Sequence, residues 1–365
     1  MSLRDHLRRL RTLLKKEWQY RRRSLKACTL QPTYRCNLRC RMCEFASLAK
    51  PGDKTRELSR DEMLKIVDEL AQMGARTLLL IGGEPFLRPE EMLAVTARAR
   101  QAGLKPFIVT NGTLIDRDLA REIVASRLRW LVFSVDGVGA AHDRVRGEGA
   151  FERVREGMRL VIEERRRRGA RRPSIGIQCT FSRLNHGQVA PLLQFKEEIG
   201  ADSAYFTYLA EVPIEKLDAT RLDGEPLCSP CWAPKGESLL LRRDELSAFR
   251  HALAGAPAGD DIRLLKALPD DAYLRCLRAP RRCYTMRTHM FINPYGDVHP
   301  CLHMDRYVTG NVRQGGLAAV WQNERHRKVI ARLPRDMYPV CSGCCLFRAN
   351  LTLSQQLRLR LFGAL

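Results

Sequence analysis

The chain has 365 residues, 45% of them hydrophobic, and a formal net charge of +22, so it can build a large core over more than one domain. It has no apolar run of about 18 residues, which excludes a transmembrane helix, and it does not begin with the apolar stretch and cleavage site of a secretory signal. Thirteen cysteines in a chain without an export signal indicate a cytoplasmic location and metal ligation rather than a disulfide framework.

Residues 1–26 form a basic segment in which ten lysines and arginines oppose only Asp5 and Glu17. Leucines recur in it at helical spacing, with basic residues between them, at Leu3, Leu7, Leu10 and Leu14. This pattern predicts an amphipathic helix, whose leucines either dock on the rest of the protein, which we prefer, or contact an anionic membrane surface. The tail from 348 to 365 repeats the pattern. Nucleic-acid binding is not expected, because no aromatic platform is interleaved with the basic residues.

The apolar run 27–33 predicts a first strand, and Cys36, Cys40 and Cys43 follow it in a CxxxCxxC spacing. A loop this short can place three thiolates on one face of a cubane iron–sulfur cluster, since cysteine is the usual cluster ligand. One iron then keeps an open position where a small molecule can bind, as in open catalytic metal sites. A zinc site is the alternative, but structural zinc takes four protein ligands and no second CxxC pair lies close by in the sequence.

Beyond this loop, predicted strands and helices alternate. The strands cover 77–81, 105–110, 130–135, 174–180 and 203–208, and the helices lie between Ser59 and Gly74 and over 89–102, 116–126, 151–168 and 188–199. With the first strand, this alternation predicts a six-stranded parallel sheet with helices outside it, curled into an incomplete α/β barrel. Active sites of such barrels lie at the C-terminal ends of the strands. A linker rich in proline and glycine follows at 211–275, with a helix over 245–254.

Candidate binding residues directly follow two of the predicted strands. Gly82, Gly83 and Glu84 follow the second strand, where glycines let backbone approach a ligand closely and a carboxylate can accept hydrogen bonds from an ammonium group. Asn111 stands at the end of the third strand. These residues are candidates for the walls of one pocket.

The fourth strand ends in the sequence SVDG, which contains Ser134, and Arg146 follows twelve residues later. Arginine suits a carboxylate ligand because its planar guanidinium donates two parallel hydrogen bonds. His142 lies between the two and could be taken for a catalytic base, but we expect it to be structural.

The C-terminal part carries a second cysteine pattern. Cys283, Gly296 and Cys301 follow a C-x12-G-x4-C spacing, which predicts a β-hairpin that turns at the glycine. Cys341 and Cys344 form a CxxC pair further on.

Taken in order, CxxxCxxC, GGEP, SxDG with its arginine and the cysteine hairpin resemble the motifs of radical S-adenosylmethionine (radical SAM) enzymes with a SPASM or twitch module. The resemblance implies that Cys36, Cys40 and Cys43 hold a [4Fe-4S] cluster. In that family the methionine moiety of S-adenosylmethionine chelates the open iron, and an electron from the cluster cleaves the sulfonium. The resulting 5′-deoxyadenosyl radical abstracts a hydrogen atom from the substrate, so the cofactor carries the difficult chemistry.

The same resemblance implies a set of cofactor-binding positions: Met42, Gly82, Gly83, Glu84, Asn111, Ser134 and Arg146. Glu84 and the backbone of the glycines would hold the methionine amino group. Ser134 and Arg146 would contact the ribose and the carboxylate of the cofactor. Met42 would pack near the adenine, where the family often has an aromatic residue and a thioether can fill the space.

For the C-terminal cysteines, the resemblance implies an auxiliary [4Fe-4S] cluster on Cys283, Cys301, Cys341 and Cys344, as in the twitch module. The complete SPASM pattern is absent because no cysteine follows Cys345. A second auxiliary cluster, or a zinc site, stays open for some of the remaining cysteines: Cys228, Cys231, Cys276 and Cys345. We therefore expect a basic N-terminal helix (1–26), a radical SAM partial barrel (27–210), the linker (211–275), an auxiliary-cluster module (276–347) and a basic tail (348–365).

The expected function is hydrogen abstraction from a small substrate, which could be anionic and sugar- or nucleotide-like, with an electron donor such as flavodoxin or ferredoxin. A peptide substrate is the alternative, although the basic segment before the first strand has only 26 residues and leaves little room for a peptide-recognition domain. From a different class, the chain could be a non-catalytic iron–sulfur electron carrier or scaffold. Such a carrier would form no 5′-deoxyadenosine from S-adenosylmethionine.

Overall fold

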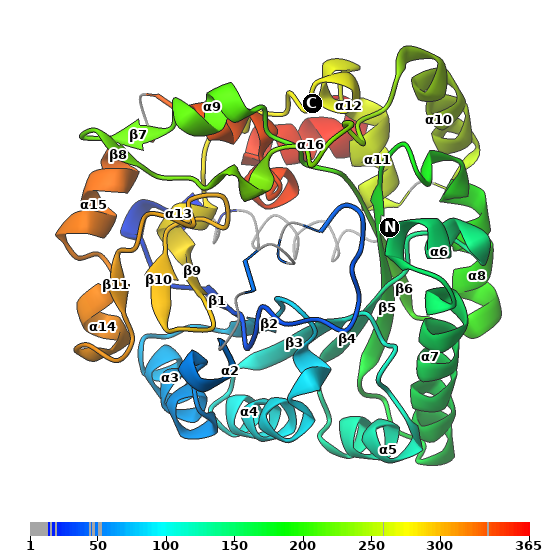
Figure 1. Cartoon of the computed structure of the whole chain (residues 1–365), viewed down its shortest axis with the longest axis horizontal. Helices are drawn as coiled ribbons and strands as arrows, with labels where there is room; N and C mark the ends of the chain where they lie inside the picture. The colour runs from blue at the N-terminus through cyan, green and yellow to red at the C-terminus, as the bar shows by residue number, and fades with distance from the viewer. Residues whose placement is uncertain are drawn as a thin grey trace.

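The computed structural model describes residues 14, 17, 18, 20–43, 45, 48, 49, 53–257, 259–333 and 336–365. Its centre is a nine-stranded curved sheet in the order β11-β10-β9-β1-β2-β3-β4-β5-β6 (Figure 1). The barrel strands are β1 (Ala27–Leu30), β2 (Thr77–Leu80), β3 (Lys105–Thr110), β4 (Trp130–Ser134), β5 (Ser174–Phe181) and β6 (Ser203–Tyr208). Each pairs in parallel with the next, so the predicted partial α/β barrel is confirmed.

Helices cover the outer face of this sheet, as Figure 1 shows. They are α3 (Arg60–Gln72), α4 (Pro89–Gln101), α5 (Arg117–Ala125), α7 (Ala150–Arg167) and α8 (Val189–Ile199). Ser59 starts α3 with a capping box: its hydroxyl accepts from the Glu62 amide at 3.2 Å, and the Glu62 carboxylate accepts from the Ser59 amide at 2.7 Å. Such reciprocal bonds satisfy two otherwise unpaired donors of the first turn.

The two faces of the barrel strands differ in character, because successive side chains point to opposite faces. On β5, Ile177 and Cys179 are fully buried and belong to the main apolar core. The intervening Gln178 is half-buried and lies in register with Tyr205 of β6. The packed set faces the helices, and the second, more polar and aromatic set lines the inside of the curve.

The C-terminal cysteine hairpin joins the barrel sheet. β9 (His289–Ile292) pairs in parallel with β1, and β10 (Asp297–His299) returns antiparallel to β9 and carries β11 (Gly310–Asn311) on its other edge. Gly296 makes the turn with φ +86°, a backbone conformation that glycine adopts without penalty. The predicted hairpin is present, but its pairing with β1 was not predicted, because nothing local in the sequence specifies a partner so far away.

The linker contains more regular structure than its proline and glycine content predicted. Its elements are α9 (Ile214–Asp218), β7 (Arg221–Leu222), β8 (Glu225–Pro226), the 3₁₀ turn η4 (Pro230–Trp232), α10 (Arg243–Gly255), α11 (Asp260–Ala267) and α12 (Asp271–Leu274). The predicted helix 245–254 lies within α10. Phe249 and Leu253 of α10 are fully buried in the main core, so this part of the linker packs as part of the barrel.

The remaining elements are short. They are α2 (Asp53–Arg56), η2 (Pro85–Leu87), α6 (Ala140–Arg146), η3 (His186–Gln188), α13 (Thr285–Thr288), α14 (Gly316–Val320), α15 (Glu324–Ala331), η5 (Pro339–Gly343), η6 (Phe347–Asn350) and α16 (Leu353–Phe362). No helix in the described part of the chain is both long and apolar enough to cross a membrane.

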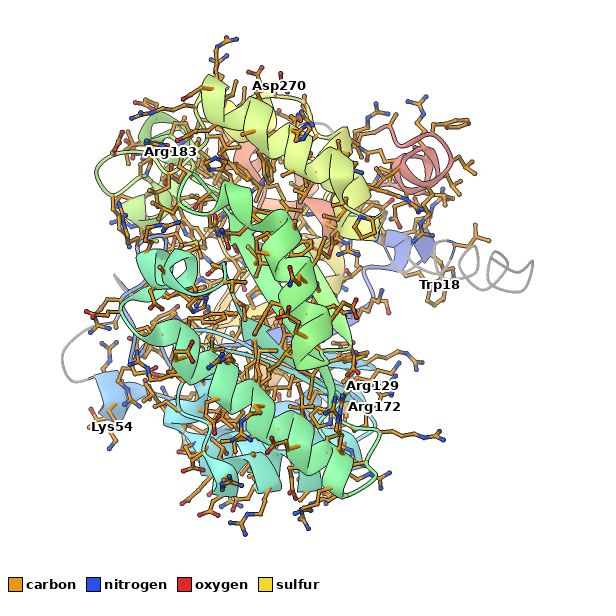
Figure 2. The ribbon with its side chains drawn as sticks, turned by 90° about the vertical axis from the view of Figure 1, so that its right-hand side faces the viewer. Trp18, Lys54, Arg129, Arg172, Arg183 and Asp270 are labelled. Carbon is orange, nitrogen blue, oxygen red and sulfur yellow. The ribbon has the colours of Figure 1, made fainter. Side chains whose placement is uncertain are left out.

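Most of the predicted N-terminal helix, including Leu3, Leu7 and Leu10, lies outside the described residues. At its C-terminal end, Glu17 accepts hydrogen bonds from Arg282 at 2.6 Å and from the Tyr284 hydroxyl at 2.7 Å. Leu14, by contrast, is 54% exposed and Trp18 is 50% exposed; Figure 2 shows Trp18 projecting from the molecule. The predicted docking of the leucines is therefore wrong for Leu14. The hydrogen bonds of Glu17 and the packing of the buried Tyr20 against Tyr284 hold this part of the segment.

Candidate active site and auxiliary cysteine site

The CxxxCxxC loop follows the C-terminal end of β1. The amide of Leu38 donates to the Cys36 sulfur at 3.4 Å, and the side-chain amide of Asn111 donates to the same sulfur at 3.7 Å. Arg146 donates to the Cys40 sulfur at 3.8 Å. Burial raises the pKa of the Cys40 thiol to about 11, the charge of Arg146 opposes that rise, and Cys43 and Cys36 add to it. The three sulfurs thus gather in one place with donors around them.

The glycines of GGEP lie against the backbone of the cysteine loop. The Gly83 amide donates to the Thr33 carbonyl and the Glu84 amide to the Arg35 carbonyl, each at 2.8 Å. A Cβ atom added at Gly83 would come within 2.0 Å of the Arg35 carbonyl oxygen. The sequence predicted glycines that admit a ligand; in the structure they admit the cysteine loop itself and fix its position.

Glu84 is a buried carboxylate between β2 and β3, with 1% of its surface exposed. It accepts hydrogen bonds from the Thr110 hydroxyl at 2.7 Å, the Asn111 amide at 2.8 Å and the Phe86 amide at 3.0 Å. Burial raises the pKa of Glu84, whereas these three bonds and the charge of Arg146 lower it. A carboxylate has about four acceptor positions, so Glu84 keeps capacity for one further donor.

Arg146, at the end of α6, forms an ion pair with Asp136 of SVDG, with 2.5 Å between Nε and Oδ2. Asp136 is fully buried and also accepts from the Thr180 amide at 2.9 Å. Burial would lower the pKa of Arg146, but the charges of Asp136 and Cys40 raise it, so the guanidinium stays protonated. The family resemblance implied a role for Arg146 toward the cofactor; within the protein, its partners are Asp136 and Cys40 of the cysteine loop.

His142 is structural, as expected. It is fully buried, and its Nδ1 accepts a hydrogen bond from the Asp136 amide at 3.1 Å. Burial, and then the charge of Arg146, lower the pKa of His142 to about 4, so the ring is neutral at physiological pH. The histidine therefore positions the SVDG turn that carries Asp136.

The other two predicted cofactor positions are Ser134 and Met42. Ser134 ends β4, in register with Gln178 of β5. Met42 lines a cavity of about 130 Å³ together with Trp232 and Lys235 from the linker. The Lys235 ammonium donates to the Cys43 carbonyl at 2.8 Å, so the linker reaches across to the cysteine loop, a contact with no signal in the sequence.

The four predicted auxiliary cysteines come together from three separate segments. Burial raises the pKa of the Cys341 thiol, and Cys283, Cys301 and Cys344 add to the rise because each lies close enough to interact with it. Asn350, which no motif predicted, ties two of the segments together. Its side chain donates to the Cys344 sulfur at 3.6 Å and accepts from the Tyr284 amide, next to Cys283, at 2.8 Å.

The unassigned cysteines lie around this group. Burial raises the pKa of Cys228, and Cys301, Asp305 and Cys231 add to it, so the linker CxxC pair lies on the Cys301 side. Cys276 lies near Cys344, because its charge contributes to the raised pKa of that thiol. Cys345 shares with Cys344 the wall of a larger cavity.

Both groups consist of cysteines, which are the usual ligands of iron–sulfur clusters. Among the described residues, no group of three or more His, Cys, Asp or Glu side chains converges as a single metal ion requires. Zinc needs its ligands within about 2.3 Å of one point, whereas a cubane cluster binds each thiolate through a different iron and tolerates wider spacing. By the chemistry of their thiolates, the three N-terminal cysteines and the four C-terminal ones are the residues that would hold [4Fe-4S] clusters.

Comparisons with known proteins agree with this geometry. The radical SAM superfamily model matches residues 30–172, and the SPASM model, an iron–sulfur cluster-binding domain, matches residues 283–345. The chain is 28% identical to an AdoMet-dependent heme synthase of Methanosarcina barkeri, with 85% of each chain covered. It is 30% identical to the mycofactocin maturase MftC of Mycobacterium ulcerans, with 81% of this chain and 74% of that protein covered.

A solved structure has the same fold. The structure titled native anSMEcpe with bound AdoMet superimposes with a TM-score of 0.61 at 17% identity, covering 89% of this chain and 87% of that one. The chain belongs to the radical SAM superfamily. Within it, the chain is a radical SAM enzyme with a C-terminal SPASM domain. Its cofactors are a [4Fe-4S] cluster, S-adenosylmethionine and auxiliary iron–sulfur clusters in the SPASM domain.

Proposed function

We propose that the chain abstracts a hydrogen atom from a small, anionic substrate at the C-terminal mouth of its barrel, next to Cys36, Cys40 and Cys43. The observation that carries the proposal is the convergence of these cysteines with Glu84, Asn111 and Arg146. When bound, the cluster and S-adenosylmethionine supply the electron and the 5′-deoxyadenosyl radical.

The protein's own residues prepare this site in two ways. Asn111 and Arg146 donate toward the sulfurs of Cys36 and Cys40, which stabilises negative charge on the thiolates. Glu84 offers its remaining acceptor position to the ammonium group of the cofactor, and burial strengthens that charge-assisted bond. The auxiliary site takes up or passes on an electron from the substrate, and a donor such as flavodoxin or ferredoxin reduces the first cluster.

Two features support a small anionic substrate over a peptide. The chain carries a net charge of +22, which attracts anions to its surface. The name of the Methanosarcina relative, a heme synthase, fits a small substrate. The name of the mycobacterial relative, a maturase, fits the peptide alternative, which the experiment below also covers. The cysteine content supports a cytoplasmic location.

We also propose that both ends of the chain contact an anionic membrane surface. Leu14 and Trp18 at one end and Leu361 and Phe362 at the other are half to three-quarters exposed. Exposed arginines accompany them, including Arg21 and Arg22. Apolar side chains with basic neighbours are the pattern of helices that lie in the membrane interface.

The proposed reaction is tested with anaerobically reconstituted full-length protein, S-adenosylmethionine and dithionite. We expect 5′-deoxyadenosine to form slowly without substrate and faster when the true substrate is added. Candidate small acids, porphyrins among them, and candidate peptides are then compared by this acceleration. A Cys40→Ser variant serves as the matched control. If the wild type forms no 5′-deoxyadenosine, the proposal is overturned and the electron-carrier alternative is favoured.

A further inference from the structure

A cavity of about 510 Å³ separates the inner face of the barrel from the auxiliary cysteine site. Phe107 of β3 and Gln178 of β5, both from the more open face of the sheet, form part of one wall, together with Tyr205 and Thr207 of β6. Cys344 and Cys345 lie in the same lining. Its volume is in the ordinary range for small-molecule sites, and its lining is mostly apolar and aromatic, as such sites usually are.

The charges in this lining are unbalanced. Three charged residues line the cavity: Asp261, Arg278 and Arg348. Asp261 and Arg348 form an ion pair with each other, and Asp261 also accepts a hydrogen bond from the Phe206 amide at 3.2 Å. The third charge, on Arg278, is left without a counterpart inside the cavity.

Arg278 is buried, with 6% of its surface exposed. One Nη donates to the Leu209 carbonyl at 3.0 Å, but the buried Nε has no hydrogen-bond partner. Among the described residues, no carboxylate oxygen lies within 4.0 Å of the Arg278 guanidinium nitrogens. A buried, unpaired charge is costly, so this guanidinium is in an environment that an incoming anion would improve.

We propose that the cavity binds the substrate, and that the substrate has an apolar, flat body with a carboxylate that pairs with Arg278. A planar guanidinium group can donate two parallel hydrogen bonds to a carboxylate. The aromatic side chains of the wall can stack on the flat body of the ligand. The inference rests on the proposed hydrogen abstraction and narrows its substrate class.

A different role for Arg278 is possible on charge alone. Burial raises the pKa of the Cys276 thiol, and the charge of Arg278 opposes that rise. Arg278 could therefore act only as a counter-charge for the auxiliary thiolates, with no contact to a ligand. The two roles predict different measurements, because a counter-charge changes a reduction potential and a carboxylate site changes ligand preference.

The test uses two fluorescent probes, 1-pyrenebutyrate and 1-pyrenebutanol, which share a flat apolar body and differ in the carboxylate. Titrated into the reconstituted holoenzyme, the carboxylate should bind about 10- to 100-fold more tightly than the alcohol, the range for hydrogen bonds to charged groups. Arg278→Gln should remove this preference, and Arg278→Lys should keep part of it. Thr207→Phe, which fills the cavity, should weaken both probes alike.

Arg172→Gln is the matched control, because Arg172 lies on the outer surface beside Arg129 (Figure 2) and should leave both affinities unchanged. Equal binding of the two probes to the wild type would overturn the proposal. So would a preference that survives Arg278→Gln while the midpoint potential of the auxiliary cluster shifts. Folding of Arg278→Gln is judged by iron content and circular dichroism. If it does not fold, the probe affinities of Arg278→Lys and Thr207→Phe test the proposal.

Formation of 5′-deoxyadenosine by the wild type keeps the two proposals separable. If the wild type cleaves S-adenosylmethionine but binds the two pyrene probes equally, only the cavity proposal is contradicted. If the wild type prefers the carboxylate probe but forms no 5′-deoxyadenosine, the proposed reaction is contradicted instead.

Discussion

Each of the two cysteine sites has a buried arginine beside it, and the two arginines differ in one respect. Arg146, next to Cys40, has a fully buried carboxylate partner in Asp136. Arg278, next to the auxiliary cysteines, has no such partner within the described residues and has a buried Nε without a hydrogen bond. Arg146 is therefore part of the framework that holds the cysteine loop. The charge of Arg278, by contrast, gains a partner only when an anionic ligand binds.

Breaking the paired arginine should have the largest effect on stability. Arg146→Gln leaves the Asp136 carboxylate buried and uncompensated, and removing one partner of a buried ion pair typically costs about 3–5 kcal/mol. We expect a drop of several degrees in the thermal midpoint of the reconstituted protein, measured by circular dichroism. Adding Asp136→Asn to the same chain should recover much of the loss. An unchanged midpoint in Arg146→Gln would show that the pair does not hold the loop.

The unpaired arginine should behave differently in the same assay. Arg278→Gln removes a charge that has no partner and gives up one hydrogen bond to the Leu209 carbonyl, so its net cost should stay within about 1 kcal/mol. Measured side by side, the thermal midpoint should therefore fall much further in Arg146→Gln than in Arg278→Gln. Equal, large losses in both would mean that Arg278 is as structural as Arg146.

A second prediction concerns Glu84, the buried carboxylate whose pKa the charge of Arg146 lowers. Glu84→Gln keeps the shape but removes the charge that would accept from the cofactor's ammonium group. A hydrogen bond to a charged group contributes about 1.5–3 kcal/mol, so the dissociation constant for S-adenosylmethionine should rise about 10- to 100-fold in equilibrium dialysis. Thr110→Val, which removes one donor to Glu84 but keeps its charge, should have a smaller effect. Equal affinities in wild type and Glu84→Gln would remove Glu84 from the cofactor site.

Arg22 of the N-terminal segment provides a third case, because it is exposed and contacts an aromatic ring instead of a buried carboxylate. Arg22 lies over the ring of the exposed Trp18, 4.7 Å from its centroid. A basic residue near an anionic bilayer contributes about 1 kcal/mol, so Arg22→Gln should weaken co-sedimentation with anionic vesicles about fivefold. High salt should weaken it as well. Wild-type protein that ignores anionic vesicles would contradict the proposed membrane contact.

Features set by neighbouring residues could be predicted from the sequence. The capping box at Ser59 and the CxxxCxxC loop depend on contacts within a few positions of the chain, and each was predicted at its observed place. The alternation of strands and helices predicted the six barrel strands for the same reason, since periodicity is a local property. The structural role expected for His142 also depends on a near neighbour, because its ring accepts a hydrogen bond from the amide of Asp136.

Features that depend on distant parts of the chain could not be predicted. The pairing of β9 with β1 joins segments that are far apart in sequence, and no local pattern specifies it. The other linker helices, α9, α11 and α12, were not predicted because prolines and glycines between them outweighed their short apolar repeats. Leu14 was expected to dock, whereas Glu17 makes the contact through Arg282, a partner that only the folded chain brings near. The isolation of Arg278 is likewise visible only once all neighbouring carboxylates have been placed.

The central claim is that the chain has two separate cluster sites and that the first one cleaves S-adenosylmethionine. Its most direct test is to replace Cys36, Cys40 and Cys43 together with alanine and to measure iron and 5′-deoxyadenosine in parallel with the wild type. With four irons in each cubane cluster, we predict about eight irons per wild-type chain, about four in the variant, and no 5′-deoxyadenosine from the variant. An unchanged iron content, or continued formation of 5′-deoxyadenosine, would contradict the account.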